Sequence, residues 1–370
     1  MRQRNSACII GVPVEKLNAK RMEKEAMMMA VKRLGRQTVR LLTAPEIATF
    51  AAVGGKMEGD GPLAACFDYL CADSYFGAKT WESAESEMLK KCFDVVLSKG
   101  GLTAEDIDFI FTGDLLNQCV GSEFALKDSN VPVFGLYGAC STMAESLSLA
   151  AMTMDGGFAD RVIAMTSSHF CSAERQFRLP LSYGGQRTPT AQWTATAAGA
   201  VILDAGATGP FVTHVTTGKI VDAGVTDAAN MGAAMAPAAM ETILTHLSET
   251  KREPDYYDLI VTGDLGFVGH DILLDLALQS GWDLSAVLND CGMLIYDREK
   301  QDVHAGGSGC GCSASVLTGH LLPKFKTGEL KRLLFCATGA LMSPTTSLQG
   351  DSILGICHAV AIEAEKPQEV

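Results

Sequence analysis

The chain has 370 residues, of which 47% are hydrophobic and 20% are charged, and its formal net charge is −13. That length allows two units with hydrophobic cores of their own, and the acidic balance argues against nucleic acid as a partner. No apolar run reaches the roughly 18 to 20 residues that cross a bilayer, and the start lacks a convincing cleavage site, so we expect neither a transmembrane segment nor a signal peptide.

The N-terminal segment differs from the rest in charge. Residues 1–40 hold ten Lys and Arg and three acids, whereas the remainder holds 20 and 40. A basic arm of this kind could touch anionic lipid. We favour a simpler explanation, because "KEAMMM" at 24–29 is what a bacterial ribosome-binding site and start codons would encode. We therefore predict that residues 1–35 are an extension with a mis-assigned start and that Met28 or Met29 is the true first residue.

The next elements are predicted as helix, strand, turn and strand. "SAESEMLKKCFDVVLSKGG" at 83–101 has apolar residues at helical spacing and a glycine stop. "DFIFTGDL" at 108–115 reads as a buried strand, and "YGACSTM" at 137–143 is a small-residue turn before a helical run. "GFADRVIA" at 157–164 reads as the next buried strand.

The second part of the chain repeats this plan. The helical pattern "PAAMETILTHLSE" at 237–249 precedes "DLIVTGDL" at 258–265, which matches 108–115. "CGCSAS" at 310–315 matches "GACSTM", and "GELKRLLF" at 328–335 matches "GFADRVIA". Three matches in one order predict two pseudo-equivalent halves, residues 36–222 and 223–370, whose small-residue turns meet near the centre.

Short buried strands that alternate with helices predict an α/β fold with mixed, mainly parallel central sheets. The plan resembles the thiolase-like superfamily, which includes the ketoacyl synthases, and this implies a layered αβαβα arrangement. In that superfamily the first-half turn bears a nucleophilic cysteine at a helix N-terminus, where the helix dipole lowers the pKa of its thiol. Cys140 matches that cysteine.

A closer resemblance rests on seven ungapped words and covers roughly residues 36 to 370. The words are "TGDLLNQ" (112–118), "GACST" (138–142), "DGGFADRV" (155–162), "TSSHF" (166–170), "AERQFRLPLSYGGQR" (173–187), "MGAAMAPAA" (231–239) and "AGGSGCGCSA" (305–314). Together they resemble the stage V sporulation protein AD family. Membership implies binding of dipicolinic acid (pyridine-2,6-dicarboxylate), alone or as its calcium chelate, and a part in its uptake into the developing spore.

The same resemblance implies a peripheral protein at the inner spore membrane, with the membrane proteins of the same spore transport system as partners. Thiolase relatives are commonly dimers, so a homodimer is expected. We expect no cofactor. We also expect no metal site, because "CGC" at 310–312 has no second Cys/His pair at a suitable spacing. The twelve cysteines are read as reduced residues of the core or the site.

Catalysis by Cys140 would need partners that the second half lacks. Ketoacyl synthases use a histidine and an asparagine there, and the alignment puts Gly263 on the histidine and Ser308 to Cys310 near the asparagine. His270 and His304 are nearby and could substitute. We predict a vestigial nucleophile and no catalytic residue; the alternative is an acyl-thioester condensing enzyme that uses Cys140.

Polar residues near the turn are candidates for ligand binding. His169 ends a predicted strand, either as a pocket residue or as a hydrogen-bonded structural histidine. Arg175, Arg178 and Arg187 lie in the loop that follows, where they could hold a carboxylate or form ordinary ion pairs. Asn117 is a further, weaker candidate: it occurs only in the first copy of the repeat, and this asymmetry hints at function. The symmetric pair Asp114 and Asp264 suggests a structural role, such as capping facing turns or pairing across the pseudo-dyad.

Overall fold

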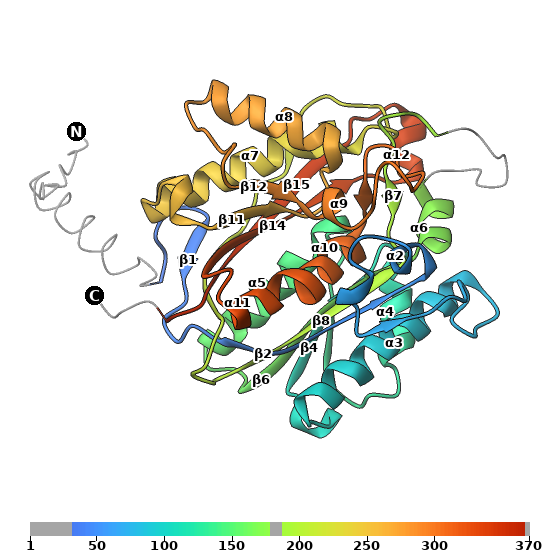
Figure 1. The fold of residues 1–370 in the computed structure, drawn as a ribbon, viewed down its shortest axis with the longest axis vertical. Coiled ribbons are helices and arrows are strands. Elements are labelled where there is room, and N and C mark those ends of the chain that lie inside the picture. The colour runs from blue at the N-terminus through green and yellow to red at the C-terminus, as the bar shows by residue number, and fades with distance from the viewer. Residues whose placement is uncertain (1–31, 178–186, 367–370) are drawn as a thin grey trace, which may run out of the picture.

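The computed structural model describes residues 32–177 and 187–366. Within these residues the strands form a 13-stranded sheet, whose main path has the order β12-β11-β14-β15-β9-β2-β8-β6-β4-β5 (Figure 1). Three short strands pair off this path: β1 (Thr38–Arg40) on β9, β3 (Tyr69–Leu70) on β2 and β10 (Val221–Asp222) on β15. A separate parallel pair joins β7 (Trp193–Thr194) to β13 (Gly307–Ser308).

One end of the main path is a five-stranded unit from the first half of the chain. Strands β5, β4 and β6 are parallel, and β8 is antiparallel both to β6 and to β2, so β2 runs in the same direction as β6. Four of these five strands therefore run one way. Their bounds are β5 (Val133–Gly135), β4 (Phe109–Gly113), β6 (Arg161–Ser168), β8 (Ala197–Asp204) and β2 (Glu46–Gly54).

The other five strands repeat this arrangement. Strands β12, β11 and β14 are parallel, β15 is reversed, and β9 again runs with β14. The two units join where β2 pairs with β9, at Glu46 and Phe211. The bounds are β12 (Leu288–Asp290), β11 (Leu259–Thr262), β14 (Arg332–Leu341), β15 (Leu354–Glu363) and β9 (Phe211–Thr216). Strand β9 precedes residue 223, where we predict the second half to begin.

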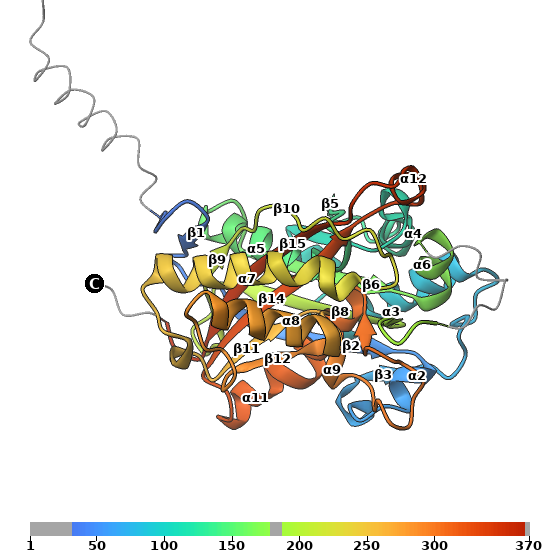
Figure 2. The same ribbon diagram turned by 90° about the horizontal axis from the view of Figure 1, so that it is seen from above.

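Helices form three layers around and between the two units. Helices α3 (Trp81–Gly100) and α4 (Val120–Leu126) cover the outer face of the first unit, and α7 (Met231–Thr250) and α8 (Gly266–Gln279) cover that of the second (Figures 1 and 2). Helices α5 (Thr142–Asp155) and α10 (Cys310–Val316) lie between the units and contact each other. Each layer holds its own cluster of buried apolar side chains. The predicted αβαβα arrangement is thus confirmed.

The remaining described helices are short. They are α2 (Lys56–Gly59), α6 (Phe170–Phe177), α9 (Cys291–Leu294), α11 (Leu322–Thr327) and α12 (Pro344–Gln349). Single 3-10 turns lie at Ala64–Cys66, Ala104–Asp106, Asn117–Cys119, Ala139–Ser141 and Pro254–Tyr256, and a π-helical turn at Leu317–Leu321 joins α10 to α11.

Local signals explain where the long outer helices begin and end. The Thr80 hydroxyl accepts a hydrogen bond from Ser83 N–H and caps the start of α3, and Gly101 ends the helix with φ 64°. The Asn230 side chain caps α7 in the same way, through Ala233 N–H. The repeated words occupy equivalent places: "DFIFTGDL" and "DLIVTGDL" contain β4 and β11, and the two small-residue turns begin α5 and α10.

The inner helices approach the sheet closely. A Cβ atom on Gly311 of α10 would lie 2.1 Å from the carbonyl oxygen of Ala197 in β8. A Cβ atom on Gly339 of β14 would lie 2.7 Å from Gly138 O and 3.1 Å from Ser141 N, in the turn that begins α5. Glycine is required at such contacts because any side chain would collide with backbone. This packing brings both central turns against strands of the opposite unit.

Candidate functional site

Cys140 lies in the 3-10 turn Ala139–Ser141 that leads into α5. Ala139 has φ 52°, in the left-handed region, and the Ser141 and Thr142 hydroxyls donate to Gly138 O and Ala139 O, each at 2.6 Å. The backbone of the turn is thereby held by its own side chains. Cys140 itself is 6% exposed.

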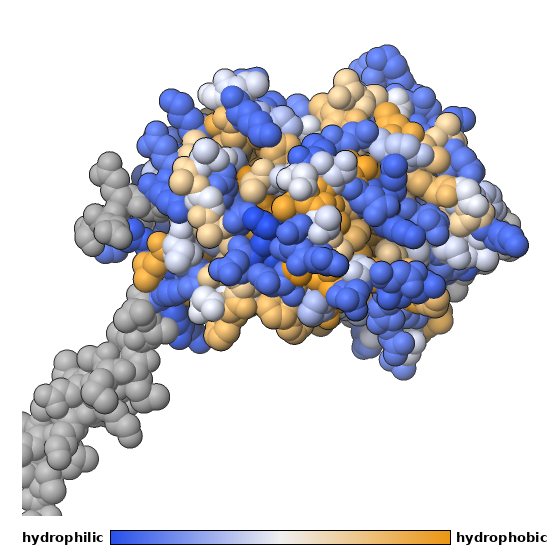
Figure 3. Space-filling model, turned by 90° about the horizontal axis from the view of Figure 1, so that it is seen from below, coloured by the Kyte–Doolittle hydropathy of each residue, from blue (hydrophilic) through white to orange (hydrophobic). Residues whose placement is uncertain are grey.

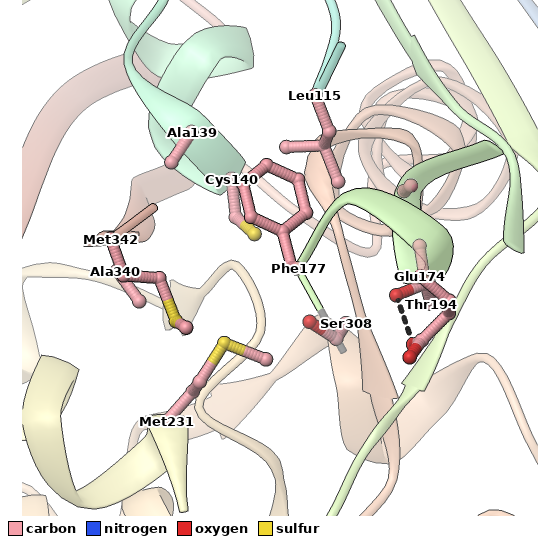
Figure 4. Close-up of a pocket in the computed structure, with 11 residues that line it drawn as sticks. Leu115, Ala139, Cys140, Glu174, Phe177, Thr194, Met231, Ser308, Ala340 and Met342 are labelled. Atoms are coloured by element: carbon pink, nitrogen blue, oxygen red, sulfur yellow. Dashed lines mark hydrogen bonds between the residues drawn. The ribbon is translucent and has the colours of Figure 1, made fainter. Parts of the chain in front are cut away.

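A small pocket of about 40 Å³ opens at Cys140 (Figure 4). Both units contribute to it: Cys140 comes from the first central turn, Ser308 from β13 before the second, and Met231 from the start of α7. We call this set of residues the Cys140 pocket: Leu115, Ala139, Cys140, Ala173, Glu174, Phe177, Thr194, Met231, Ser308, Ala340 and Met342.

The wall of the pocket is mostly apolar, with a few polar groups. Figure 4 shows Phe177 from α6 beside Cys140, and Met231 and Met342 across the cavity. Glu174 accepts a hydrogen bond of 2.8 Å from the Thr194 hydroxyl. An outer cavity of about 300 Å³ shares five lining residues with the pocket and extends to Tyr137, Ser343 and Thr346. The outer cavity therefore reaches the lower end of the range of small-molecule sites, roughly 300 to 1,000 Å³.

Asp264 lies behind Cys140, at the end of β11. Its carboxylate is fully buried and accepts hydrogen bonds from Gly309 N–H (2.9 Å), the Ser308 hydroxyl (3.2 Å) and the Thr338 hydroxyl (2.8 Å). Asp264 therefore connects the start of the second central turn to β14.

The electrostatics of this arrangement do not activate the thiol. Burial raises the pKa of Cys140 well above its ordinary value, and the charge and hydrogen bond of Asp264 raise it further. Burial also raises the pKa of Asp264. A reactive cysteine needs the opposite environment, in which positive charge stabilises the thiolate. In the thiolase-like superfamily the pKa of the nucleophilic thiol is expected to be lowered, whereas the pKa of the Cys140 thiol is raised.

Of the predicted ligand-binding residues, Cys140 lines the pocket, and four others lie elsewhere in the described structure. His169 is 1% exposed; its Nε2 contacts Ser74 O at 2.8 Å, its Nδ1 has no partner among the described residues, and burial lowers its pKa. Arg175 pairs with Glu82. Their binding roles stay predictions.

The other predicted residues do not line the Cys140 pocket within the described chain. Arg187 pairs with Asp302 at 3.3 Å and its guanidinium lies 4.8 Å above the Trp193 ring. Asn117 accepts a hydrogen bond of 3.3 Å from Tyr137, which lines the outer cavity. Arg178 lies outside the described residues, although Phe177, which precedes it, is in the pocket wall.

Gly263 and Ser308 stand at or near the positions of the catalytic histidine and asparagine of ketoacyl synthases, and their surroundings differ from each other. A Cβ atom on Gly263 would lie 3.0 Å from Ala337 Cα, so the position leaves little space for a side chain. Ser308 lines the pocket. His270 lies beside Asp271 and His304 beside Asp302, at 3.3 and 2.9 Å, and neither lines the described pocket.

Sequence reasoning missed several lining residues. Phe177, Met231 and Met342 reach the pocket from segments far apart in the chain, and no local pattern marks them as neighbours. The repeat marks Asp264, for which we predict a structural role. Over the described ranges, no group of three or more His, Cys, Asp or Glu could hold a metal ion, and no helix has the length and apolar character to span a membrane.

The sequence of the chain matches a known protein family and a curated relative. The family model of Stage V sporulation protein AD (SpoVAD) matches residues 35–363. A curated relative of that name from Bacillus subtilis (strain 168) is 44% identical over 309 residues, which are 84% of this chain and 91% of the relative.

Solved structures of condensing enzymes share the fold. The 3-oxoacyl-[acyl-carrier-protein] synthase III of Aquifex aeolicus VF5 matches 86% of this chain and 100% of its own, with TM-score 0.51 and 15% identity. A Xanthomonas campestris OleA variant with cerulenin matches 86% and 96%, with TM-score 0.55 and 12% identity. At these identities the likeness bears on the fold alone, and it confirms a thiolase-like fold.

Proposed function

The chain belongs to the Stage V sporulation protein AD family, and from this premise we propose that it binds dipicolinic acid and takes part in its uptake into the developing spore, without catalysing a condensation. The proposal places the protein at the periphery of the inner spore membrane in the developing forespore and spore. Its partners there are the membrane proteins of the same transport system.

The observation that carries the proposal is a mostly apolar pocket around an unactivated cysteine, continuous with a larger outer cavity. Phe177 and the two methionines offer a surface for an aromatic ring. The Thr194 and Ser308 hydroxyls lie on the polar side of the cavity, where they donate hydrogen bonds to Glu174 and Asp264. Arg178 follows Phe177 in the sequence and lies outside the described residues, and we propose it as the residue that meets a ligand carboxylate. These features support binding of a small aromatic dicarboxylate.

Three features support a noncatalytic role. The pKa of the Cys140 thiol is raised rather than lowered, Gly263 stands where a catalytic histidine would stand, and no histidine lines the described pocket. Without a thiolate or a base, Cys140 cannot attack a thioester efficiently at neutral pH.

The second candidate is an acyl-thioester condensing enzyme, which the condensing-enzyme fold and the retained cysteine favour. Incubation with radiolabelled acetyl-CoA or malonyl-CoA separates the two candidates. Stable labelling of the wild-type protein that is lost in Cys140→Ser would support the enzyme. We expect no such label.

Calorimetric titration with dipicolinate tests binding directly. We expect saturable one-to-one binding by the wild-type protein, measured with and without calcium to identify the form of the ligand that is bound. Benzoate serves as a control, since it keeps an aromatic ring but has one carboxylate. Absence of dipicolinate binding in both conditions would refute the proposal.

We also propose that the protein is a homodimer, and the two edges of the sheet support this. Strand β5 is an edge strand with Val133 and Phe134 42% and 51% exposed, whereas β12 at the other edge is partly covered. An exposed apolar edge strand readily pairs with another strand. In analytical ultracentrifugation, Phe134→Lys should shift the protein towards monomer, while Leu278→Lys on α8 should not. A wild-type monomer would contradict the proposal.

A further inference from the structure

The polar side of the Cys140 pocket holds two hydroxyl groups whose hydrogens are already engaged. Thr194 in β7 and Ser308 in β13 are partners in the parallel pair of short strands, so they occupy adjacent positions. The Thr194 hydroxyl donates to Glu174 at 2.8 Å (Figure 4), and the Ser308 hydroxyl donates to Asp264 at 3.2 Å. Because a hydroxyl has one hydrogen and two lone pairs, both oxygens can only accept a hydrogen bond from a ligand.

The two carboxyl groups that receive these hydrogens are fixed as acceptors. Asp264 is fully buried and also accepts from Gly309 N–H at 2.9 Å and from the Thr338 hydroxyl at 2.8 Å. Glu174 is 4% exposed and lines the pocket itself. In the described part of the wall the remaining polar side chain is Cys140, whose thiol is a weak donor. The side chains of the pocket therefore offer a ligand acceptor oxygens and negative charge.

The pocket has room for the end group of a ligand and not for a ring. Its volume of about 40 Å³ corresponds to about three water-sized spheres, which is the number of heavy atoms in a carboxyl group. The outer cavity of about 300 Å³ shares five lining residues with it and has the room for a ring. A dicarboxylate that enters from the outer cavity therefore places one carboxyl group beside Glu174, Thr194 and Ser308.

We propose that the Cys140 pocket binds one carboxyl group of the ligand in its protonated form, so that binding of dipicolinate takes up one proton from solution. The inference rests on the proposed function and names the form in which the ligand is bound. An ionised carboxylate would meet two acceptor oxygens and the Glu174 charge in a buried site, whereas a carboxylic acid supplies the missing donor. The other carboxyl group stays ionised, as binding to Arg178 requires.

The charges around the pocket act in the same direction. Its titratable side chains are Cys140, Glu174 of α6, Asp264 behind Ser308, and Cys310 of α10, which packs in one cluster with Cys140. Burial raises the pKa of both thiols well above the ordinary value, so the thiols stay neutral. The formal net charge of the chain is −13, and hydrophilic side chains cover much of the face shown in Figure 3. The field of the whole molecule therefore also disfavours a dianion.

A calcium ion is the other partner that would let a carboxylate enter a pocket lined by acceptors. Calcium takes roughly six to eight oxygen ligands. Over the described ranges of the chain, no group of three or more His, Cys, Asp or Glu could hold a metal ion. The geometry therefore favours a proton over calcium, and the calcium chelate becomes an outcome of the test.

The number of protons taken up is measured by calorimetry with dipicolinate at about pH 7, in two buffers of different ionisation enthalpy. The difference in apparent binding enthalpy between the buffers gives this number. For wild-type protein without calcium we expect about one proton per bound ligand. We also expect the affinity to fall about tenfold between about pH 7 and 8, as linkage to one proton requires. A count near zero, or binding that needs calcium and takes up no proton, would overturn the inference.

A variant of Glu174 tests the same point from the side of the protein. Glu174→Gln removes the charge and gives the pocket an amide donor, so a carboxylate can enter without a proton. We expect its proton uptake to fall to near zero and its affinity at about pH 8 to rise. Glu123→Gln is the matched control, because Glu123 is an exposed residue of α4 outside both cavities, and it should behave as wild type. Unchanged proton uptake in Glu174→Gln would contradict the inference, and if this variant does not fold, the wild-type count decides alone.

The monoamide of dipicolinate keeps the two proposals apart, because its amide supplies a donor without taking up a proton. We expect it to bind wild-type protein with no proton uptake and with an affinity that changes little with pH. If the monoamide binds in this way and dipicolinate does not bind, the proposed function fails and the inference stands. Binding of neither ligand refutes both, and binding of dipicolinate without proton uptake refutes the inference alone.

Discussion

At the scale of single residues, the three arginines after His169 differ in their structural partners. Arg175 pairs with Glu82 and Arg187 pairs with Asp302. Arg178 follows Phe177, a residue of the Cys140 pocket. We predict that Arg178→Ala weakens dipicolinate binding roughly ten- to a hundredfold, the cost of one charge-assisted hydrogen bond.

Calorimetry measures this effect, and Arg175→Ala and Arg187→Ala are the matched controls. Their partners are protein groups, so we expect smaller changes in affinity. Circular dichroism verifies that each variant is folded. Unchanged affinity in all three variants would count against the arginine loop as the carboxylate site.

Cys140 should tolerate the loss of its sulfur but not the loss of space. Cys140→Ser keeps the volume nearly constant and retains a group that can hydrogen-bond to a carboxylate, so we expect most of the dipicolinate affinity to remain. Cys140→Phe should abolish binding, because the pocket is enclosed by close-packed residues. The measurements are ligand affinity and spore dipicolinate content. Full binding with no loading of spores in the serine variant would argue for covalent chemistry at Cys140.

The sequence identifies some residues of the site and not others, for physical reasons. Cys140 stands out because a turn of small residues before a helix is a local pattern. Met231 and Met342 carry no local pattern, and they meet Cys140 only because α7 and β14 pack around the first turn. The repeat marks Asp264, but its hydrogen bonds with Gly309 and Thr338 depend on contacts between segments far apart in the sequence.

At the scale of elements, the repeated words predicted the central strands and the two inner helices. What they could not predict is strand direction. Strands β8 and β15 run against their neighbours, yet their buried runs look like those of β6 and β14, because residue burial carries no information on direction. The pairing of β2 with β9, which joins the units at Glu46 and Phe211, likewise depends on contacts far apart in the sequence.

The close contact of α10 with β8 gives a prediction for one glycine. A Cβ atom on Gly311 would lie 2.1 Å from Ala197 O and 2.8 Å from Ser168 N, both rigid backbone atoms. We expect Gly311→Ala to lower the free energy of unfolding by about 1 to 3 kcal/mol or more, as overpacking in a core does. Urea denaturation measures it. Gly135→Ala in β5, where the added atom meets nothing within 4 Å, should change stability little, and equal effects in both would refute the packing argument.

At the scale of the whole molecule, buried histidines and buried carboxyl groups change the stability of the fold in opposite directions as the pH changes. Burial lowers the pKa of His214 to about 3 and that of His358 to about 4. Below about pH 6.5 these histidines are therefore protonated in the unfolded chain but stay neutral in the folded chain. Their contribution to stability is present above about pH 6.5, the ordinary pKa of histidine, and is lost as the pH falls towards these values. As the pH falls, the free energy of unfolding should therefore decrease already at pH values at which most carboxylates are still ionised.

Buried carboxyl groups act in the opposite direction, and Glu85 is the sharpest case. Burial, helped by the charge of Asp114, raises the pKa of Glu85 to about 8. The folded chain then holds a proton that the unfolded chain releases above about pH 4.5, so stability from this group is complete below that pH and is lost as the pH rises towards 8. Glu85→Gln cannot titrate. We expect its free energy of unfolding to improve steadily relative to wild type between about pH 5 and 8.

Denaturant titrations at a series of pH values measure this difference. Glu87→Gln is the matched control, since it lies two residues away on the exposed side of the same helix, α3. Its difference from wild type should not change in the same direction over this range. The Glu85 carboxyl also accepts hydrogen bonds from Ser167 and Ser172, at 3.1 and 2.7 Å, so the variant has a fixed cost at every pH. The change with pH in the difference in free energy of unfolding between Glu85→Gln and wild type reports the buried proton, whereas the constant cost does not. A difference that stays constant with pH would mean that Glu85 is ionised in the folded protein.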